Sequence, residues 1–369
     1  MKYWRGYLVA AFLSIFTWAL AQFAAGHIQL MDMVYPYMIR VLLPEVTQWS
    51  AGVSFNLWQV LLLVAIVGIV ASLVLMIVLR WNPVQWFGWV LAVSCLFTFL
   101  NTGIFGLGKY TSPIAEDILL NMEEYSMESL EDAATYYRDK ANELSQAVKR
   151  DSQGNVDFSS FEQLAANAGG GFQYLTYQRG FAIFSGDLTP VKELGWSDLY
   201  ASRGVTGMTV YLTGEAAVNP KTPEVGLPFA ICKEMAKRMS IFRDSEANFA
   251  AFLASTCYDK LPVEYQYSAY LMAYRAMYNT IAATEGGLAQ ALAKTLNSGA
   301  SVRLVKDIQS YDAFFSASQA EAPDQLFTDL LVSWHIQEVV IPSHQVTEDS
   351  FDPMDETDER LQDIVEKVA

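Results

Sequence analysis

An uninterrupted apolar run at residues 57–79 constrains the fold of this chain more than any other feature. Its 23 residues include no charged side chain. About 20 apolar residues in an α-helix are enough to cross the hydrocarbon core of a bilayer. We therefore expect a membrane-spanning helix here.

A second uncharged run follows at residues 84–107. Trp81, Trp86 and Trp89 lie where an aromatic belt would meet the membrane surface. Only residues 80–83 separate the two runs, so we expect a tight helical hairpin.

A third apolar segment, residues 7–25, follows Lys2 and Arg5. Its positive start and the Ala19-Leu-Ala21 triplet would suit a cleaved signal peptide. The apolar run that continues to Ala25 suits a retained span, which we favour.

The basic residues predict the orientation. By the positive-inside rule, Lys2, Arg5 and Arg80 lie on the inner side of the membrane, which places residues 27–56 and 109–369 outside. The composition of residues 27–56 favours an interfacial helix along the outer leaflet, with an extended connection as the alternative. We thus expect a membrane region at residues 1–108 and an extracytoplasmic domain at residues 109–369.

The outward part is acidic. It holds 20 Lys or Arg and 38 Asp or Glu, a formal charge of −18, and much of the acid lies in residues 348–366. Such a domain repels phosphate groups, which argues against nucleic acid and against tight contact of this domain with anionic headgroups.

We expect the outward domain to be mainly helical, of the α+β class, with a small sheet. β-Branched residues and alternation predict one strand at residues 205–218. A run of three glycines, residues 169–171, is expected to end the second helix. The predicted helices cover residues 127–150, 158–168, 228–242, 245–258, 262–284, 286–297 and 323–340.

The segment Lys233-Glu234-Met235-Ala236-Lys237 matches H-E-x-x-H position for position. In that motif, residues i and i+4 hold zinc from one helical face, and the intervening glutamate activates the metal-bound water. Of the three functional residues of that motif, only the glutamate is retained, as Glu234. Lysines stand at the two histidine positions, and a lysine ammonium has no lone pair to donate to a metal. A K-E-x-x-K run alone occurs in many amphipathic helices, so the flanking segments must decide its meaning.

Those flanks resemble, in order, segments of an uncharacterised bacterial family of membrane-anchored, zincin-like proteins, a domain of unknown function. The similar segments are Met33-Val-Tyr-Pro-Tyr37, Tyr125-Ser-Met-Glu-Ser-Leu130, Gly204-Val-Thr-Gly-Met208, Leu212-Thr-Gly-Glu-Ala-Ala-Val-Asn219, Leu227-Pro-Phe229, Asp244-Ser-Glu-Ala-Asn-Phe249 and Tyr267-Ser-Ala-Tyr270.

The resemblance implies a zincin-like fold in which Lys233 and Lys237 replace two zinc histidines. It implies a third ligand position at Asp244, with Glu246 as a second acidic candidate, and it makes Glu234 a relic of the general base. Zinc is the family's expected cofactor, and we predict that it is lost here. We expect the lysines to pair with these carboxylates in place of the metal, since buried carboxylates need partners. The alternative puts both lysines on the solvated face of an amphipathic helix.

The resemblance also implies a peptide cleft beside the strand that precedes the motif helix. Glu215 and Asn219 are therefore candidates for that cleft. Tyr267 or Tyr270 is a candidate oxyanion donor. A buried aromatic face is the alternative for these tyrosines.

The cysteines and histidines leave several alternatives open. Cys232 and Cys257 are expected either to form a disulfide or to remain buried thiols. His335 and His344 are candidates to approach the cleft from the last helix, although they form no metal-binding pattern.

The sequence favours a catalytically inactive, membrane-anchored pseudopeptidase that binds a peptide, an envelope component or another membrane protein. An active metallopeptidase with a carboxylate-rich metal site, which His335 or His344 would complete, is the alternative. A metal-free hydrolase with Lys233 or Lys237 beside Ser240 is a third possibility. Uncharged spans argue against transport.

Overall fold

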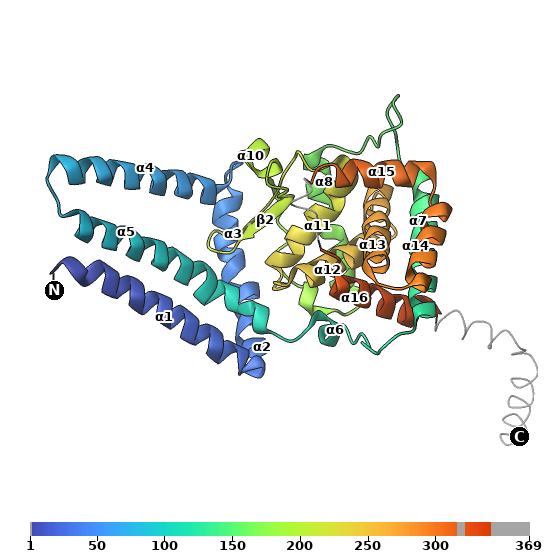
Figure 1. Cartoon of the computed structure of the whole chain (residues 1–369), viewed down its shortest axis with the longest axis horizontal. Helices are drawn as coiled ribbons and strands as arrows, with labels where there is room; N and C mark the ends of the chain where they lie inside the picture. Colours follow the sequence, from blue (N-terminus) through green and yellow to red (C-terminus); the bar gives the residue numbers. More distant parts are fainter. Residues whose placement is uncertain (1, 316–321, 341–369) are drawn as a thin grey trace, which may run out of the picture.

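The structure is a computed structural model and describes residues 2–315 and 322–340. Three helices are long and apolar enough to cross a membrane: α1 (Arg5–Ala25), α4 (Leu57–Val78) and the helix at Pro83–Gly103, whose first part is α5 (Pro83–Thr98). They project from one side of a helical body (Figure 1). All three predicted spans are therefore present as helices, and the third ends near Gly103 rather than at residue 107.

The two hairpin spans separate as they leave their connecting turn. Asn82 caps α5 by accepting hydrogen bonds from Val84 N (3.0 Å) and Gln85 N (3.2 Å). Near the turn, Trp86 Nε1 donates to Ser72 Oγ on α4 at 3.0 Å. Beyond this point α1 packs along α5, whereas α4 diverges from both helices (Figure 1).

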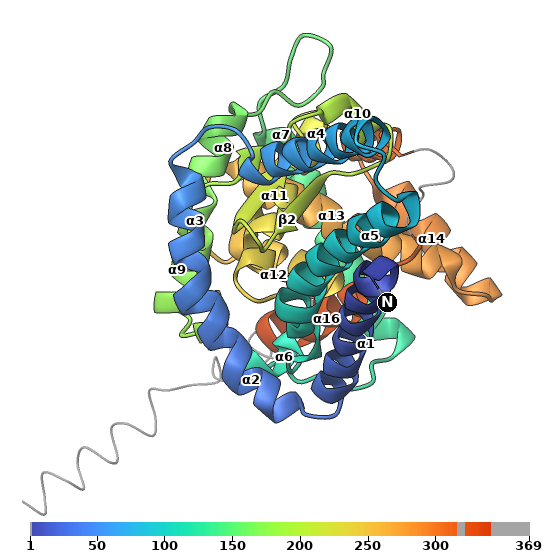
Figure 2. The same ribbon diagram turned by 90° about the vertical axis from the view of Figure 1, so that its left-hand side faces the viewer.

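Residues 28–51 are helical. They form α2 (Ile28–Tyr37), a π-helical stretch (Met38–Leu42) and α3 (Leu43–Ala51). Figure 2 shows these segments as an arc that leads from the end of α1 to the start of α4. The segment is thus helical rather than extended, and its location at the outer leaflet stays a prediction.

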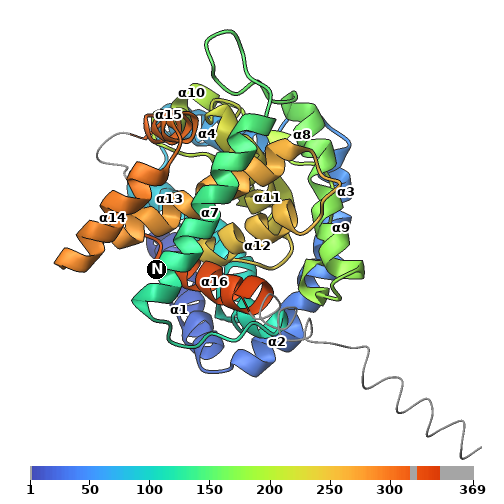
Figure 3. The ribbon, with the colours of Figure 1, turned by 90° about the vertical axis from the view of Figure 1, so that its right-hand side faces the viewer.

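The body is built around α11 (Leu227–Arg238), α12 (Asp244–Thr256) and α13 (Val263–Ala283), whose buried side chains form a large part of the core. Figure 3 shows α7, α14, α15 and α16 on the side away from the membrane helices. The remaining helices are α6 (Ile114–Asp117), α7 (Met127–Ala147), α8 (Phe161–Asn167), α9 (Gly169–Tyr177), α10 (Ser197–Ala201), α14 (Gly287–Gly299), α15 (Val302–Asp312) and α16 (Gln325–His335), which continues as a π-helical stretch (Ile336–Val340).

A three-stranded sheet lies beside α11, in the order β1–β3–β2. β1 (Lys192–Glu193) runs parallel to β3 (Glu215–Val218), and β2 (Gly207–Val210) runs antiparallel to β3. The prediction of one continuous strand at residues 205–218 was wrong, because residues 211–214 form a turn. Gly214 has φ +64°, which a glycine adopts without strain. The predicted fold class, mainly helical with a small sheet, is confirmed.

Helix α8 ends at Asn167, just before the glycine run at residues 169–171, as predicted. The run was not expected to be helical itself, but it opens α9, which packs on α12. A Cβ on Gly171 would lie 1.9 Å from the carbonyl oxygen of Ala254, so the lack of a side chain permits a close helix contact there. Helix α15 was not predicted.

Candidate functional site

Helix α11 carries the Lys-Glu-Met-Ala-Lys motif through the centre of the body. Ten of its twelve residues are buried, and the two lysines are the exceptions. Lys237 is four positions after Lys233, so both lie on the same helical face. Their side chains are only 19% and 17% exposed, which is too little for a freely solvated face.

Lys237 lies between two carboxylates. Its Nζ is 3.1 Å from Glu234 Oε1 and 2.7 Å from Asp244 Oδ1. Glu234 is buried, with 2% of its side chain exposed, whereas the Asp244 side chain at the rim is 69% exposed. The ammonium therefore neutralises a buried charge on one side and contacts a solvated one on the other.

The charges fix the protonation state of this group. Burial lowers the pKa of Lys237, but the carboxylates of Glu234 and Asp244 outweigh burial and hold the pKa above its usual value. For Asp244, partial burial raises the pKa, and the ammonium groups of Lys233 and Lys237 outweigh it and lower the pKa overall. Lys237 is therefore a cation at neutral pH and is unsuited to act as a general base.

Strand β2 completes the surroundings of Glu234. Thr209 Oγ1 donates to Glu234 Oε2 at 2.8 Å. A Cβ at Gly207 would fall 2.7 Å from Glu234 Cγ, so a glycine lets the carboxylate lie against the strand. Gly207 and Thr209 are at alternate positions of β2. This spacing is visible in the sequence, but we did not use it as a signal.

Lys233 differs from Lys237 because it is almost unpaired. Its Nζ reaches Asp244 Oδ1 only at 4.0 Å. It lines a cavity of about 360 Å³ that also involves α12, α13 and the segment before α16. Among the lining residues are Thr206, Phe229, Asp244, Asn248 and Asp324. The lysine therefore offers donors to a ligand at this cavity.

Glu246 does not join these residues. It forms an ion pair with Arg243 at 2.8 Å and accepts a hydrogen bond from Ile114 N at 3.2 Å. Of the expected lysine partners, the structure therefore brings together Glu234 and Asp244 and holds Glu246 elsewhere.

Glu215 lies at the start of a membrane helix. Its carboxylate is fully buried and accepts hydrogen bonds from Leu57 N (2.8 Å) and Trp58 N (2.9 Å), the first residues of α4. Lys192 Nζ contacts Glu215 Oε1 at 2.7 Å and donates to the backbone carbonyls of Ser50, near the end of α3, and Phe55, before α4. A negative charge is favourable at a helix N-terminus, so this pair anchors α4 to the sheet. Both residues lie more than 130 residues from the backbone groups of residues 50–58 that they contact, which explains why we did not predict the anchor.

The other proposed cleft residues hold the body together. Asn219 is buried, and its Nδ2 donates to the carbonyls of Ser197 (3.1 Å) and Val205 (3.0 Å). Tyr270 packs at the edge of Phe252. Neither residue lines the cavity at Lys233.

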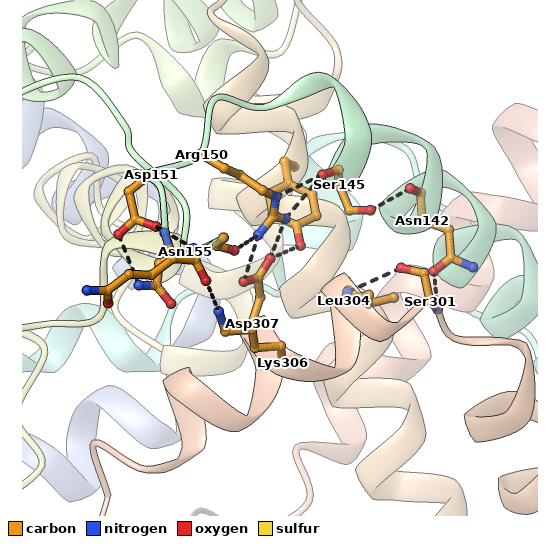
Figure 4. A network of polar contacts seen from close by, with 12 residues as sticks. Asn142, Ser145, Arg150, Asp151, Asn155, Ser301, Leu304, Lys306 and Asp307 are labelled. Carbon is orange, nitrogen blue, oxygen red and sulfur yellow. Dashed lines mark hydrogen bonds and ion pairs between the residues drawn. The ribbon is translucent and has the colours of Figure 1, made fainter.

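Tyr267 is fully buried and donates its hydroxyl to Asp307. Arg150 forms a two-point contact with the same carboxylate, at 3.2 and 2.7 Å (Figure 4). Burial, and then Asp307, raises the pKa of Tyr267. Tyr267 thus belongs to a polar network that joins α13 to α15 and the loop after α7, which matches the alternative of a buried tyrosine.

Among the described residues, the remaining candidates form no hydrogen bond or ion pair with Lys233 or Lys237. Cys232 and Cys257 are free thiols, and burial raises the pKa of each to about 12. His335 Nε2 contacts Asp132 Oδ2 on α7 at 2.9 Å. Ser240 has φ +78° directly after α11, and its buried Oγ has no hydrogen-bond partner among the described residues. His344 falls outside the described residues.

The side chains present do not fit a zinc ion. Lys233 and Lys237 present ammonium groups, which have no lone pair to donate to a metal. Within residues 2–315 and 322–340, no three His, Cys, Asp or Glu side chains gather in a metal-binding arrangement.

No curated protein and no solved structure matches this chain. One family model covers residues 31–331, from α2 through the motif helix into α16. By this match, the chain belongs to the family described as "Protein of unknown function (DUF3810)".

Proposed function

We propose that the protein is a membrane-anchored, zincin-like pseudopeptidase that binds an extended peptide or a peptide-bearing envelope partner without cleaving it. The observation that carries the proposal is the position of Lys237. Its ammonium occupies the space between Glu234 and Asp244, so a positive charge supplied by the chain replaces the one that a metal would supply.

The free edge of β2 supports peptide binding. β2 is an outer strand, and within the described residues only β3 pairs with it. Asn219 N donates to Thr206 O at 2.8 Å. Antiparallel pairs alternate, so Met208 and Val210 bond to β3 while Gly207 and Thr209 direct their backbone groups to the free edge. An extended peptide adds to such an edge through main-chain hydrogen bonds.

Lys233 supports a preference for an acidic ligand. It is the cation beside the cavity that has the weakest internal partner, and a carboxylate of a bound peptide would form a closer ion pair than Asp244 does. Side-chain specificity would then come from this cavity, and affinity from the β2 edge.

The first test is the metal content of the full chain, purified in detergent and incubated with zinc. We expect no bound metal in the natural protein. We expect one zinc in a variant that carries Lys233→His and Lys237→His, with Asp244→Glu added so that the longer carboxylate side chain can reach the metal. Lys233→Ala with Lys237→Ala is the matched control, because it removes the cations without adding ligands. Stoichiometric zinc in the natural protein would overturn the proposal and favour the active metallopeptidase.

The second test addresses peptide binding. A library of fluorescein-labelled acidic hexapeptides is screened by fluorescence anisotropy. Thr209→Pro removes an outward N–H and should abolish binding, whereas Thr209→Val keeps that N–H and loses only the hydroxyl bond to Glu234. Equal binding by both variants would refute the strand-addition mode.

A further inference from the structure

A second cavity lies in the membrane region, between α4 and α5 near their connecting turn. Its volume is about 1160 Å³. Small side chains of α4 and large apolar side chains of α5 line it, and the turn closes one end. The lining includes Ala65, Gly68, Ser72, Trp86, Trp89 and Val93.

The α4 wall of this crevice is left open by the protein. None of the most apolar 18 residues of α4 is buried. A Cβ built on Gly68 would meet nothing within 4 Å. In a bilayer, apolar surfaces of this kind are filled by acyl chains or by another helix.

The closed end of the crevice is polar and positively charged. Arg80 lines it, and its guanidinium makes no hydrogen bond or ion pair with any described residue. No Asp or Glu is among the lining residues. Trp81, the next residue in the turn, also lines the crevice, as expected for a side chain at headgroup level. The charge is therefore complementary to a phosphate.

The length of the crevice favours a lipid over a partner helix as its occupant. Arg80 is fifteen positions after Ala65, which is about 22 Å of helix. Half of a bilayer, headgroups included, is also about 20–22 Å thick. The crevice thus spans one leaflet, whereas a partner helix would need contact across both.

We propose that this crevice binds one anionic diacyl phospholipid, with its phosphate at Arg80 and its acyl chains between α4 and α5. The site is independent of the peptide cleft. The site also differs in charge from the acidic body. It offers a positive charge, which is carried by a residue of the membrane region.

The test is native mass spectrometry of the full chain in detergent, with phosphatidylglycerol or phosphatidylcholine of identical chains added. We expect about a fivefold preference for phosphatidylglycerol, the effect of about one well-placed cation. Arg80→Gln should remove the preference. Arg5→Gln should keep it, since it deletes the same charge from the same end of the membrane region but does not line the crevice.

A second pair of variants tests the acyl-chain site. Gly68→Phe fills open space in the crevice and should reduce the binding of both lipids. Ala71→Phe adds the same bulk to α4 outside the lining and should not. The proposal fails if Arg5→Gln and Arg80→Gln act alike, if Gly68→Phe binds normally, if free glycerol phosphate competes as well as the lipid, or if a second copy of the chain fills the crevice instead.

Discussion

Replacing Lys237 by methionine tests whether the lysine compensates a buried charge. The substitution keeps an unbranched side chain, one atom shorter, and removes the ammonium 3.1 Å from Glu234 Oε1. Glu234 would retain Thr209 as a hydrogen-bond donor but no counter-charge. Removal of one partner from a buried ion pair costs about 3–5 kcal/mol. Because Lys237 is 17% exposed, we expect the lower end, about 3 kcal/mol, at neutral pH.

The assay is thermal unfolding of the full chain in detergent by differential scanning fluorimetry. For a body of this size, about 3 kcal/mol lowers Tm by about 6–12 °C. Adding Glu234→Gln to Lys237→Met removes the unpaired charge and should restore all but about 1 kcal/mol of the loss. The reasoning is refuted if Lys237→Met unfolds at the natural temperature, or if the double variant is no more stable than Lys237→Met alone.

Three further variants follow from other contacts. Glu215→Gln leaves Lys192 without its counter-charge and turns an amide N–H₂ toward the N-terminus of α4, so we expect a loss of about 3 kcal/mol in the same unfolding assay. Gly171→Ala should cost at least about 1–3 kcal/mol, because the added Cβ meets Ala254 O; an unchanged Tm would contradict that close contact. Burial, and then Asp32, raises the pKa of Asp117 to about 6, so the folded state binds more protons than the unfolded state between about pH 4 and pH 6. Stability therefore falls as pH rises through that window, and Asp117→Asn should stabilise the protein at pH 7.5 but not at pH 4, as measured by Tm across pH.

The membrane spans and most helices of the body were predictable because their signal is local. A run of apolar residues or a 3.6-residue period is visible in a short window, and α11 to α13 begin within one residue of their predicted starts. The β2–β3 hairpin was merged into one strand, because the turn at residues 211–214 contains only one glycine and no proline. The start of α9 was missed because a glycine run usually interrupts a helix.

The site was predictable in part for a similar reason. Lys233, Glu234 and Lys237 share one helix face, and Asp244 follows after a short connection, so their proximity was foreseeable from spacing. Thr209 and the anchor formed by Glu215 depend on where distant segments pack, which one sequence does not reveal. Charge type alone could not show which carboxylate contacts the lysines. Asp244 does, whereas Glu246 pairs with Arg243.

The anchor at the start of α4 also bears on the order in which the chain is made and assembled. Glu215 follows Leu57 by 158 residues, so α4 is synthesised and inserted long before its N-terminal N–H groups can find their carboxylate. Final docking of the helical body must therefore wait until the β2–β3 hairpin has been translated. A secreted fragment that starts at residue 109 would carry Glu215 without either backbone donor, and Lys192 without its carbonyl acceptors. Biochemical work on this protein should therefore keep the spans and the body in one polypeptide.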